Sequence, residues 1–166
     1  MCLVTEHARL IRQYQELLAK TIEIVPVTDI VMLSRSDFLA EMAKVNIIPI
    51  DLGTPLDADL SITSKAELDR IAPFLVQLAG LYILQIRDCE DYGIEAQSRA
   101  ASYHVSGIRL GLGNINNSQA SGYHGFVLTL DKEYNIWWLE PNASFEYAGV
   151  WYKIGEHGYF PDKIFA

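Results

Sequence analysis

The sequence has 166 residues, of which half are apolar, and it carries a net charge of −8 at pH 7. This length suits one compact domain over residues 1–166, and the apolar content excludes a disordered chain. An acidic surface repels phosphate, which excludes electrostatic binding to nucleic acid or to an anionic membrane. The longest apolar run, residues 71–86, is interrupted by Pro73, Gln77 and Gly80, so we expect no membrane span.

The two cysteines, Cys2 and Cys89, provide no disulfide framework. The first seven residues lack the basic region followed by an apolar core that marks a secretory signal. We therefore expect a soluble, cytoplasmic protein in a reducing compartment, where Cys89 stays a free thiol.

The chain up to about residue 104 is predicted to be mainly helical. Apolar residues recur at helical spacing, or start signals occur, in four segments: residues 5–20, 36–42, 65–81 and 88–104. Ser34 or Ser36 is the candidate N-cap of the second helix. Ser64 and Glu67 have the spacing of a capping box at the start of the third. Residues 45–52 read as extended, and Pro49 excludes a central place in a sheet.

Residues 51–63 are rich in turn formers and acidic side chains. We expect a loop with at most one short strand there. Asp57 and Asp59 are a candidate cation pair, but aspartates in such a loop usually face water, so no metal and no cofactor is assigned.

The chain after residue 104 changes to the alternating pattern of strands. Four strands are predicted, at residues 105–112, 123–131, 135–140 and 145–154. A polar loop, residues 113–121, separates the first two, and residues 132–135 supply a hairpin turn. Short connections favour antiparallel pairing, so the predicted fold is α+β, with helices (about 1–104) packed on an antiparallel sheet (about 105–166).

Cys89 opens the fourth predicted helix, and its surroundings act on the thiol in opposite directions. Free N–H groups and the dipole at a helix start favour a thiolate. The carboxylates of Asp88, Glu90 and Asp91 oppose it, whereas an imidazolium at His124 would favour it. The sequence leaves this balance open.

His124 and Glu140 are predicted neighbours in space. With a hairpin turn near residues 132–134, strand residues near 124 pair with those near 140–142, because index sums stay constant along an antiparallel hairpin. The chain order Cys89, His124, then Glu140 or Asn142 is that of a thiol nucleophile activated by a histidine that a third group orients.

Three short segments resemble a known family. Cys89-Glu90-Asp91-Tyr92-Gly93 is similar to the start of the nucleophile helix in papain-like domains of the mushroom-agglutinin type and in related phage-encoded domains. Tyr123-His124-Gly125-Phe126 resembles the histidine strand of these domains, and Leu139-Glu140-Pro141-Asn142 resembles the segment with the third catalytic residue. The resemblance covers about residues 82–142.

The resemblance implies a papain-like fold and a role for each matched residue. Cys89 would be the nucleophile, His124 the general base and acid, and Glu140 the residue that orients the imidazole. Asn142 would share or replace the role of Glu140, and Asp91 would be structural. Tyr123 replaces a glycine of the family and could narrow the cleft.

The backbone N–H of Cys89 is a candidate oxyanion donor, with Gln85 as a second. The main functional hypothesis is a papain-like cysteine hydrolase that cleaves a peptide or amide bond in a peptide or protein substrate.

Two alternatives stay open. The first is a catalytically silent relative that serves as a binding or structural module associated with a phage. The polar loop and an aromatic group would then form its recognition surface, unless those aromatics belong to the sheet core: Trp137, Trp138, Tyr147, Trp151 and Tyr152. The second is a metal site of Cys89, His124 and Glu140, which lacks paired-ligand spacing.

Overall fold

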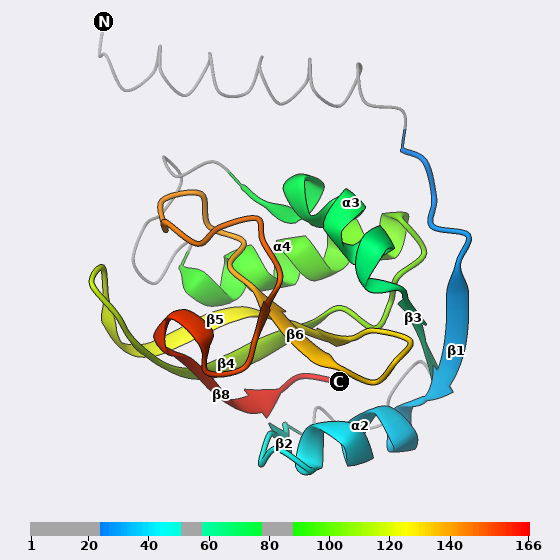
Figure 1. The fold of residues 1–166 in the computed structure, drawn as a ribbon, viewed down its shortest axis with the longest axis horizontal. Helices are drawn as coiled ribbons and strands as arrows, with labels where there is room; N and C mark the ends of the chain where they lie inside the picture. Colours follow the sequence, from blue (N-terminus) through cyan, green and yellow to red (C-terminus); the bar gives the residue numbers. More distant parts are fainter. Residues whose placement is uncertain (1–23, 51–57, 78–87) are drawn as a thin grey trace, which may run out of the picture.

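The computed structural model describes residues 24–50, 58–77 and 88–166, and it shows an α+β fold (Figure 1). The described helices are α2 (Arg35–Ala43), α3 (Lys65–Leu75), α4 (Cys89–Ser102) and the short 3₁₀ helix η2 (Glu156–Gly158). The predicted helix at residues 5–20 and the candidate Gln85 lie outside the described residues.

A six-stranded sheet forms the centre of the described chain. Its strand order is β2-β8-β4-β5-β6-β7, and its strands are β2 (Ile48–Pro49), β4 (Arg109–Asn116), β5 (Ser121–Leu130), β6 (Ile136–Leu139), β7 (Tyr152–Lys153) and β8 (Tyr159–Ile164). Neighbouring strands are antiparallel except β2, which runs parallel to β8. The predicted α+β fold with an antiparallel sheet in residues 105–166 is confirmed. At one edge this sheet also includes β2 from earlier in the chain, and Pro49 takes the non-central place expected of a residue without an N–H.

A separate two-stranded sheet pairs β1 (Ile30–Ser34) with β3 (Asp59–Thr63). Both strands lie in the part of the chain expected to be mainly helical. The prediction of helices before residue 104 and strands after it is therefore incomplete. The strand β3 is the one short strand expected within residues 51–63.

The helices lie on the two faces of the large sheet (Figure 1). On one face α3 and α4 pack with Val127 and Leu139, and on the other α2 packs with Leu128 and Trp138. This division follows from the period of two along a strand, since neighbouring residues of β5 and β6 point to opposite faces.

Several element ends differ from the sequence prediction. The segment 145–154 is a strand only at β7, and β8 was not predicted. Half of the predicted polar loop is strand, because β4 continues to Asn116. Gly113 makes this pairing possible: a Cβ at this position would lie 2.3 Å from the Phe160 carbonyl oxygen of β8.

The start signals of the helices are confirmed in part. Ser34 caps α2, and its Oγ accepts the Asp37 N–H at 3.1 Å. Ser64 is the N-cap of α3 but makes no side-chain capping bond. The described helix α3 ends at Leu75, after Pro73.

Candidate active site

Cys89 is the first residue of α4, and a capping box holds this helix start. Asp88 is the N-cap, and the Oδ2 atom of Asp91 accepts the Asp88 N–H at 3.1 Å. The carboxylate of Asp91 therefore satisfies a backbone donor that the helix leaves free, which is the structural role expected of it.

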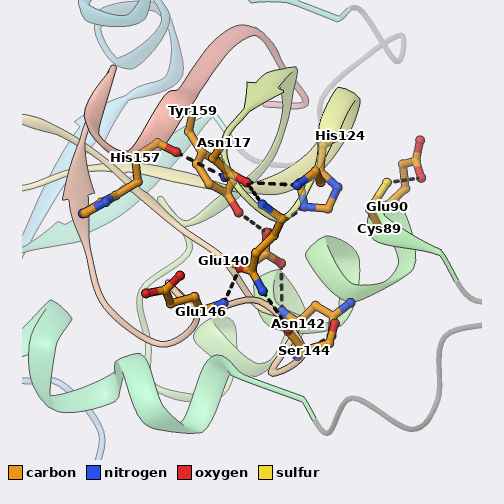
Figure 2. Close-up of polar contacts among 12 residues, drawn as sticks. Cys89, Glu90, Asn117, His124, Glu140, Asn142, Ser144, Glu146, His157 and Tyr159 are labelled. Carbon is orange, nitrogen blue, oxygen red and sulfur yellow. Dashed lines mark hydrogen bonds and ion pairs between the residues drawn. The ribbon is translucent and has the colours of Figure 1, made fainter.

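The thiol of Cys89 is held by an acidic neighbour. Its Sγ donates to the Oε2 atom of Glu90 at 3.1 Å (Figure 2). Burial raises the pKa of the Cys89 thiol to about 12, and the hydrogen bond to Glu90 acts in the same direction. The thiol is therefore protonated at neutral pH in this arrangement, and the effect of the helix start is outweighed.

The strand β5 approaches this helix start closely at Gly125. A Cβ on Gly125 would lie 3.1 Å from the carbonyl carbon and oxygen of Cys89 and from the Glu90 nitrogen. The Gly125 N–H also hydrogen-bonds to the thiol and works against the rise in its pKa. The thiol thus lies against the backbone of β5 at Gly125, the residue after His124.

His124 and Glu140 form a buried pair. Nε2 of His124 lies 2.7 Å from Oε2 of Glu140, and the side chains are 9% and 0% exposed (Figure 2). The ladder of β5 and β6 pairs Val127 with Leu139, so its index sum places residue 124 opposite residue 142. The predicted closeness of His124 and Glu140 is confirmed.

The carboxylate of Glu140 accepts three hydrogen bonds in the described chain. Oε2 accepts from His124 and from the Tyr159 hydroxyl at 3.0 Å, and Oε1 accepts the Asn142 N–H at 2.9 Å. A fully buried carboxylate is stable as an anion only with such partners. The site therefore holds a charged group in a fixed position behind the imidazole.

Tyr159 belongs to this site although the sequence analysis did not identify it. It is fully buried on β8, and its ring stacks on Trp138 with centroids 3.8 Å apart. Burial and the negative charge of Glu140 raise the pKa of its hydroxyl, which therefore remains a donor. The signal that could have found it is the alternation of residues 159–164, which Pro161 obscures.

Asn142 contacts the site through its backbone. Its side-chain Oδ1 accepts from the Ser144 N–H at 3.0 Å and from the Ser144 hydroxyl at 2.7 Å. Glu140 rather than Asn142 thus contacts the imidazole, while Asn142 shapes the turn that follows.

Gln77, which the sequence analysis did not assign to the site, fixes the segment after Glu140. Its N–H donates to the Pro141 carbonyl at 2.8 Å, and its carbonyl accepts the Ala143 N–H at 2.9 Å. Its side chain also donates to the Tyr92 carbonyl of α4 at 2.9 Å. One buried residue, through its backbone and its side chain, therefore ties this segment to the helix of Cys89.

Glu90 lies on the far side of the Cys89 thiol from His124 (Figure 2). Its pKa is lowered mainly by the hydrogen bond from Cys89 and also, to a smaller extent, by the charge of His124. In the view of Figure 2 the sulfur lies between the imidazole and the Glu90 carboxylate. Among the described residues the thiol donates to Glu90 and makes no hydrogen bond to His124.

The side chain of Tyr123 reaches toward β8. Its hydroxyl donates to the Asp162 carboxylate of β8 at 2.8 Å, and its side chain is half exposed. Hydrogen bonding and burial raise its pKa to about 12, with burial as the larger cause.

The predicted aromatic group divides between core and surface. Trp138 and Trp151 are buried in the two cores, and Trp137, Tyr147 and Tyr152 pack against them while partly exposed. In the described ranges, no group of three His, Cys, Asp or Glu side chains could hold a metal ion. No helix in those ranges is long and apolar enough to cross a membrane.

Comparisons with known proteins support the fold only. No protein-family model matches the sequence, and no curated protein matches it. Eight chains of solved structures match, among them one described as "PSL1a-E64 complex", with a TM-score of 0.56 and 11% identity. The match covers 81% of this chain and 51% of the other, so this chain spans about half the length of that neighbour.

Proposed function

We propose that this chain is a papain-like cysteine hydrolase that cleaves a peptide or amide bond. One observation carries the proposal: His124, bonded to the buried Glu140 at 2.7 Å, directly precedes the glycine whose N–H contacts the Cys89 thiol. A nucleophile, a base and a group that orients the base are the three parts that such catalysis needs.

The contact with Glu140 assigns the two nitrogens of the imidazole. Nε2 carries the proton that it donates to the carboxylate, so Nδ1 is left as the acceptor in the neutral ring. The free acceptor can then take the thiol proton of Cys89, while the fixed carboxylate stabilises the imidazolium that results.

The reaction would run in two stages. The thiol proton moves to Nδ1 of His124, Sγ attacks the acyl carbon, and the backbone N–H of Cys89 donates to the oxyanion. The C–N bond breaks as Nδ1 returns the proton to the leaving amine, which leaves a thioester. Water then attacks the thioester carbon and gives a proton to Nδ1. As the C–S bond breaks, this proton returns to sulfur and the carboxylic acid leaves.

Glu90 sets the condition for the first step. The thiol must leave the Glu90 carboxylate before its proton can move to His124. A rotation of the Cys89 side chain would exchange one acceptor for the other. The described arrangement is then the resting state of the enzyme.

The proposal is tested with E64, the compound named with the solved neighbour. The protein with Cys2→Ser is incubated with E64, and the mass of the peptide that contains Cys89 is measured. We expect an adduct on Cys89 that is lost in His124→Ala, together with cleavage of a mixed peptide library. No adduct and no cleavage at pH 6–8 would refute the hydrolase.

A silent module is the second candidate, and the state of the thiol favours it. A thiol with a pKa of about 12, bonded to a carboxylate, is a poor nucleophile at neutral pH. In that case the same fold would bind a peptide or protein without cleaving it. The cytoplasmic location and the association with a phage stay predictions under both candidates.

A further inference from the structure

A pocket of about 410 Å³ opens beside the imidazole of His124. Its size lies within the range of about 300–1,000 Å³ that is usual for ligand sites. The residues that line it come from the facing ends of β4 and β5 and from the segment after β6: Ile115, Ala120, Ser121, Gly122, Tyr123, His124, Asn142, Ser144 and Phe145.

Hydrogen bonds connect the two walls of this pocket. Gln119, in the turn between β4 and β5, accepts the Glu146 N–H at 2.7 Å and donates to the Ser144 carbonyl at 3.5 Å. The turn itself is fixed by Asn117, whose Oδ1 accepts the N–H groups of Gln119 and Ala120 at 3.0 and 3.1 Å. The pocket is therefore held between two tied segments.

The lining is mostly apolar, and among the described residues that form it only His124 and the phenol of Tyr123 are ionisable. Ile115 is buried near the turn of the β4–β5 hairpin, and the Phe145 ring lies against the imidazole with centroids 4.9 Å apart. The described lining residues include no carboxylate, ammonium or guanidinium, so a charged side chain would lose water there without gaining a partner among them.

We propose that this pocket binds a large apolar side chain of the peptide substrate, next to the bond that is cleaved. The proposal rests on the hydrolase function, because it is His124 in the wall that brings the occupant close to the reacting group. An aromatic or branched aliphatic side chain fits both the volume and the lining.

The first test measures binding without chemistry. The Cys89→Ala protein, with Cys2→Ser, is titrated with N-acetyl-phenylalaninamide, N-acetyl-leucinamide, N-acetyl-lysinamide and N-acetyl-glutamic acid amide. Amide NMR signals report the contact. We expect the two apolar probes to shift the signals of Ser121 and Ser144 saturably, and each charged probe to bind at least ~10-fold more weakly. Equal binding of a charged probe, or no binding of the apolar ones, would overturn the proposal.

Filling the pocket tests its position. Ala120→Trp and Ser121→Trp each place a ring among the lining residues, and Ser121 is exposed, so the second variant keeps the test valid if the first does not fold. Ser118→Trp is the matched control on the same turn, since Ser118 is exposed and does not line the pocket. We expect binding of the phenylalanine probe to fall at least ~10-fold in a folded filling variant and to persist in the control. Unchanged binding in both filling variants would contradict the assignment.

The outcomes separate this inference from the proposed function. Saturable binding of the apolar probes with an unreactive Cys89 would leave the pocket in place and remove the hydrolase. A reactive Cys89 that cleaves peptides with no preference for apolar side chains would support the hydrolase and overturn the proposed role of the pocket.

Discussion

The hydroxyl of Tyr159 donates to the Glu140 oxygen that lies 2.7 Å from His124. Two donors from different strands thus meet at one buried carboxylate oxygen, and each limits how the carboxylate can turn. The position of the imidazole depends on β8 as well as on β5 and β6.

Tyr159→Phe tests this dependence, because it removes the hydroxyl and keeps the ring that stacks on Trp138. We expect a loss of about 1.5–3 kcal/mol in the free energy of unfolding, as for a hydrogen bond to a charged group. Urea unfolding measures it.

Tyr152→Phe is the matched control, because the Tyr152 ring also contacts Trp138, with centroids 5.0 Å apart, but lies partly exposed. We expect this change to lower the free energy of unfolding by less than about 0.5 kcal/mol. Equal losses in the two variants would contradict a special role for the Tyr159 hydroxyl.

Glu140→Gln replaces the carboxylate by an amide of the same shape. Three donors point at this side chain, so the new NH₂ group would face at least one of them or lose its own partner. We expect a loss of about 1–3 kcal/mol in the free energy of unfolding. Chemical unfolding measures the loss, and the exposed Glu146→Gln serves as control.

Glu90→Gln should make the thiol of Cys89 more reactive. The carboxylate accepts the thiol proton, and its charge helps to raise the pKa of Cys89 to about 12. Removing that charge lowers this pKa, so the rate of alkylation by iodoacetamide at pH 8 should rise. Mass spectrometry of the alkylated fraction over time measures the rate.

The control for that variant is Glu95→Gln, since Glu95 lies on the same helix and pairs with Arg99 instead. We expect its alkylation rate to equal that of the parent. A Glu90→Gln rate that is unchanged or slower would show that Glu90 does not hold the thiol in its protonated form.

The raised pKa of Cys89 also predicts a dependence of stability on pH. The folded pKa of about 12 lies above that of an unfolded thiol, so the unfolded state releases its proton first as the pH rises above about 9. Stability should therefore be unaffected by this group below about pH 8.5 and fall between about pH 9 and 12.

Tyrosines with raised pKa values add a decline of their own as the pH approaches 10, because the unfolded phenol ionises near that pH. The effect of Cys89 is therefore the difference between two proteins with and without this thiol. The loss in the free energy of unfolding that Cys89 causes should stay below ~1.4 kcal/mol per pH unit, because the thiol is partly open to solvent. Urea unfolding of the Cys2→Ser protein should show the decline, and a further Cys89→Ser should make it smaller. An identical decline in both proteins would refute the raised pKa.

The arrangement of His124 and Glu140 could be predicted from the sequence because it depends on two strands joined by a short turn. Alternation fixes which residues share a face, and the turn fixes the register, so no distant part of the chain was needed. The start of α4 at Cys89 also depends only on neighbouring residues, because Asp88 and Asp91 have the spacing of an N-cap and its partner.

The parts that were missed depend on contacts far apart in the sequence. Tyr159 reaches Glu140 only because β8 pairs with β4, and Pro161 weakens the strand signal of β8. The glycines and asparagines of β4 read as a loop, although Gly113 is needed where β8 comes close. The state of the thiol depends on the burial that β5 causes at Gly125, which the pattern of residues near Cys89 does not reveal.

The most direct measurement of the central claim is the pH dependence of Cys89 alkylation in the Cys2→Ser protein, with and without His124→Ala. We expect His124 to accelerate the reaction, so that the variant reacts at least ~10-fold more slowly between pH 6 and 8. Equal rates at every pH, both rising toward a pKa of about 12, would contradict it. That result would leave a binding module in which Cys89 is an inert thiol.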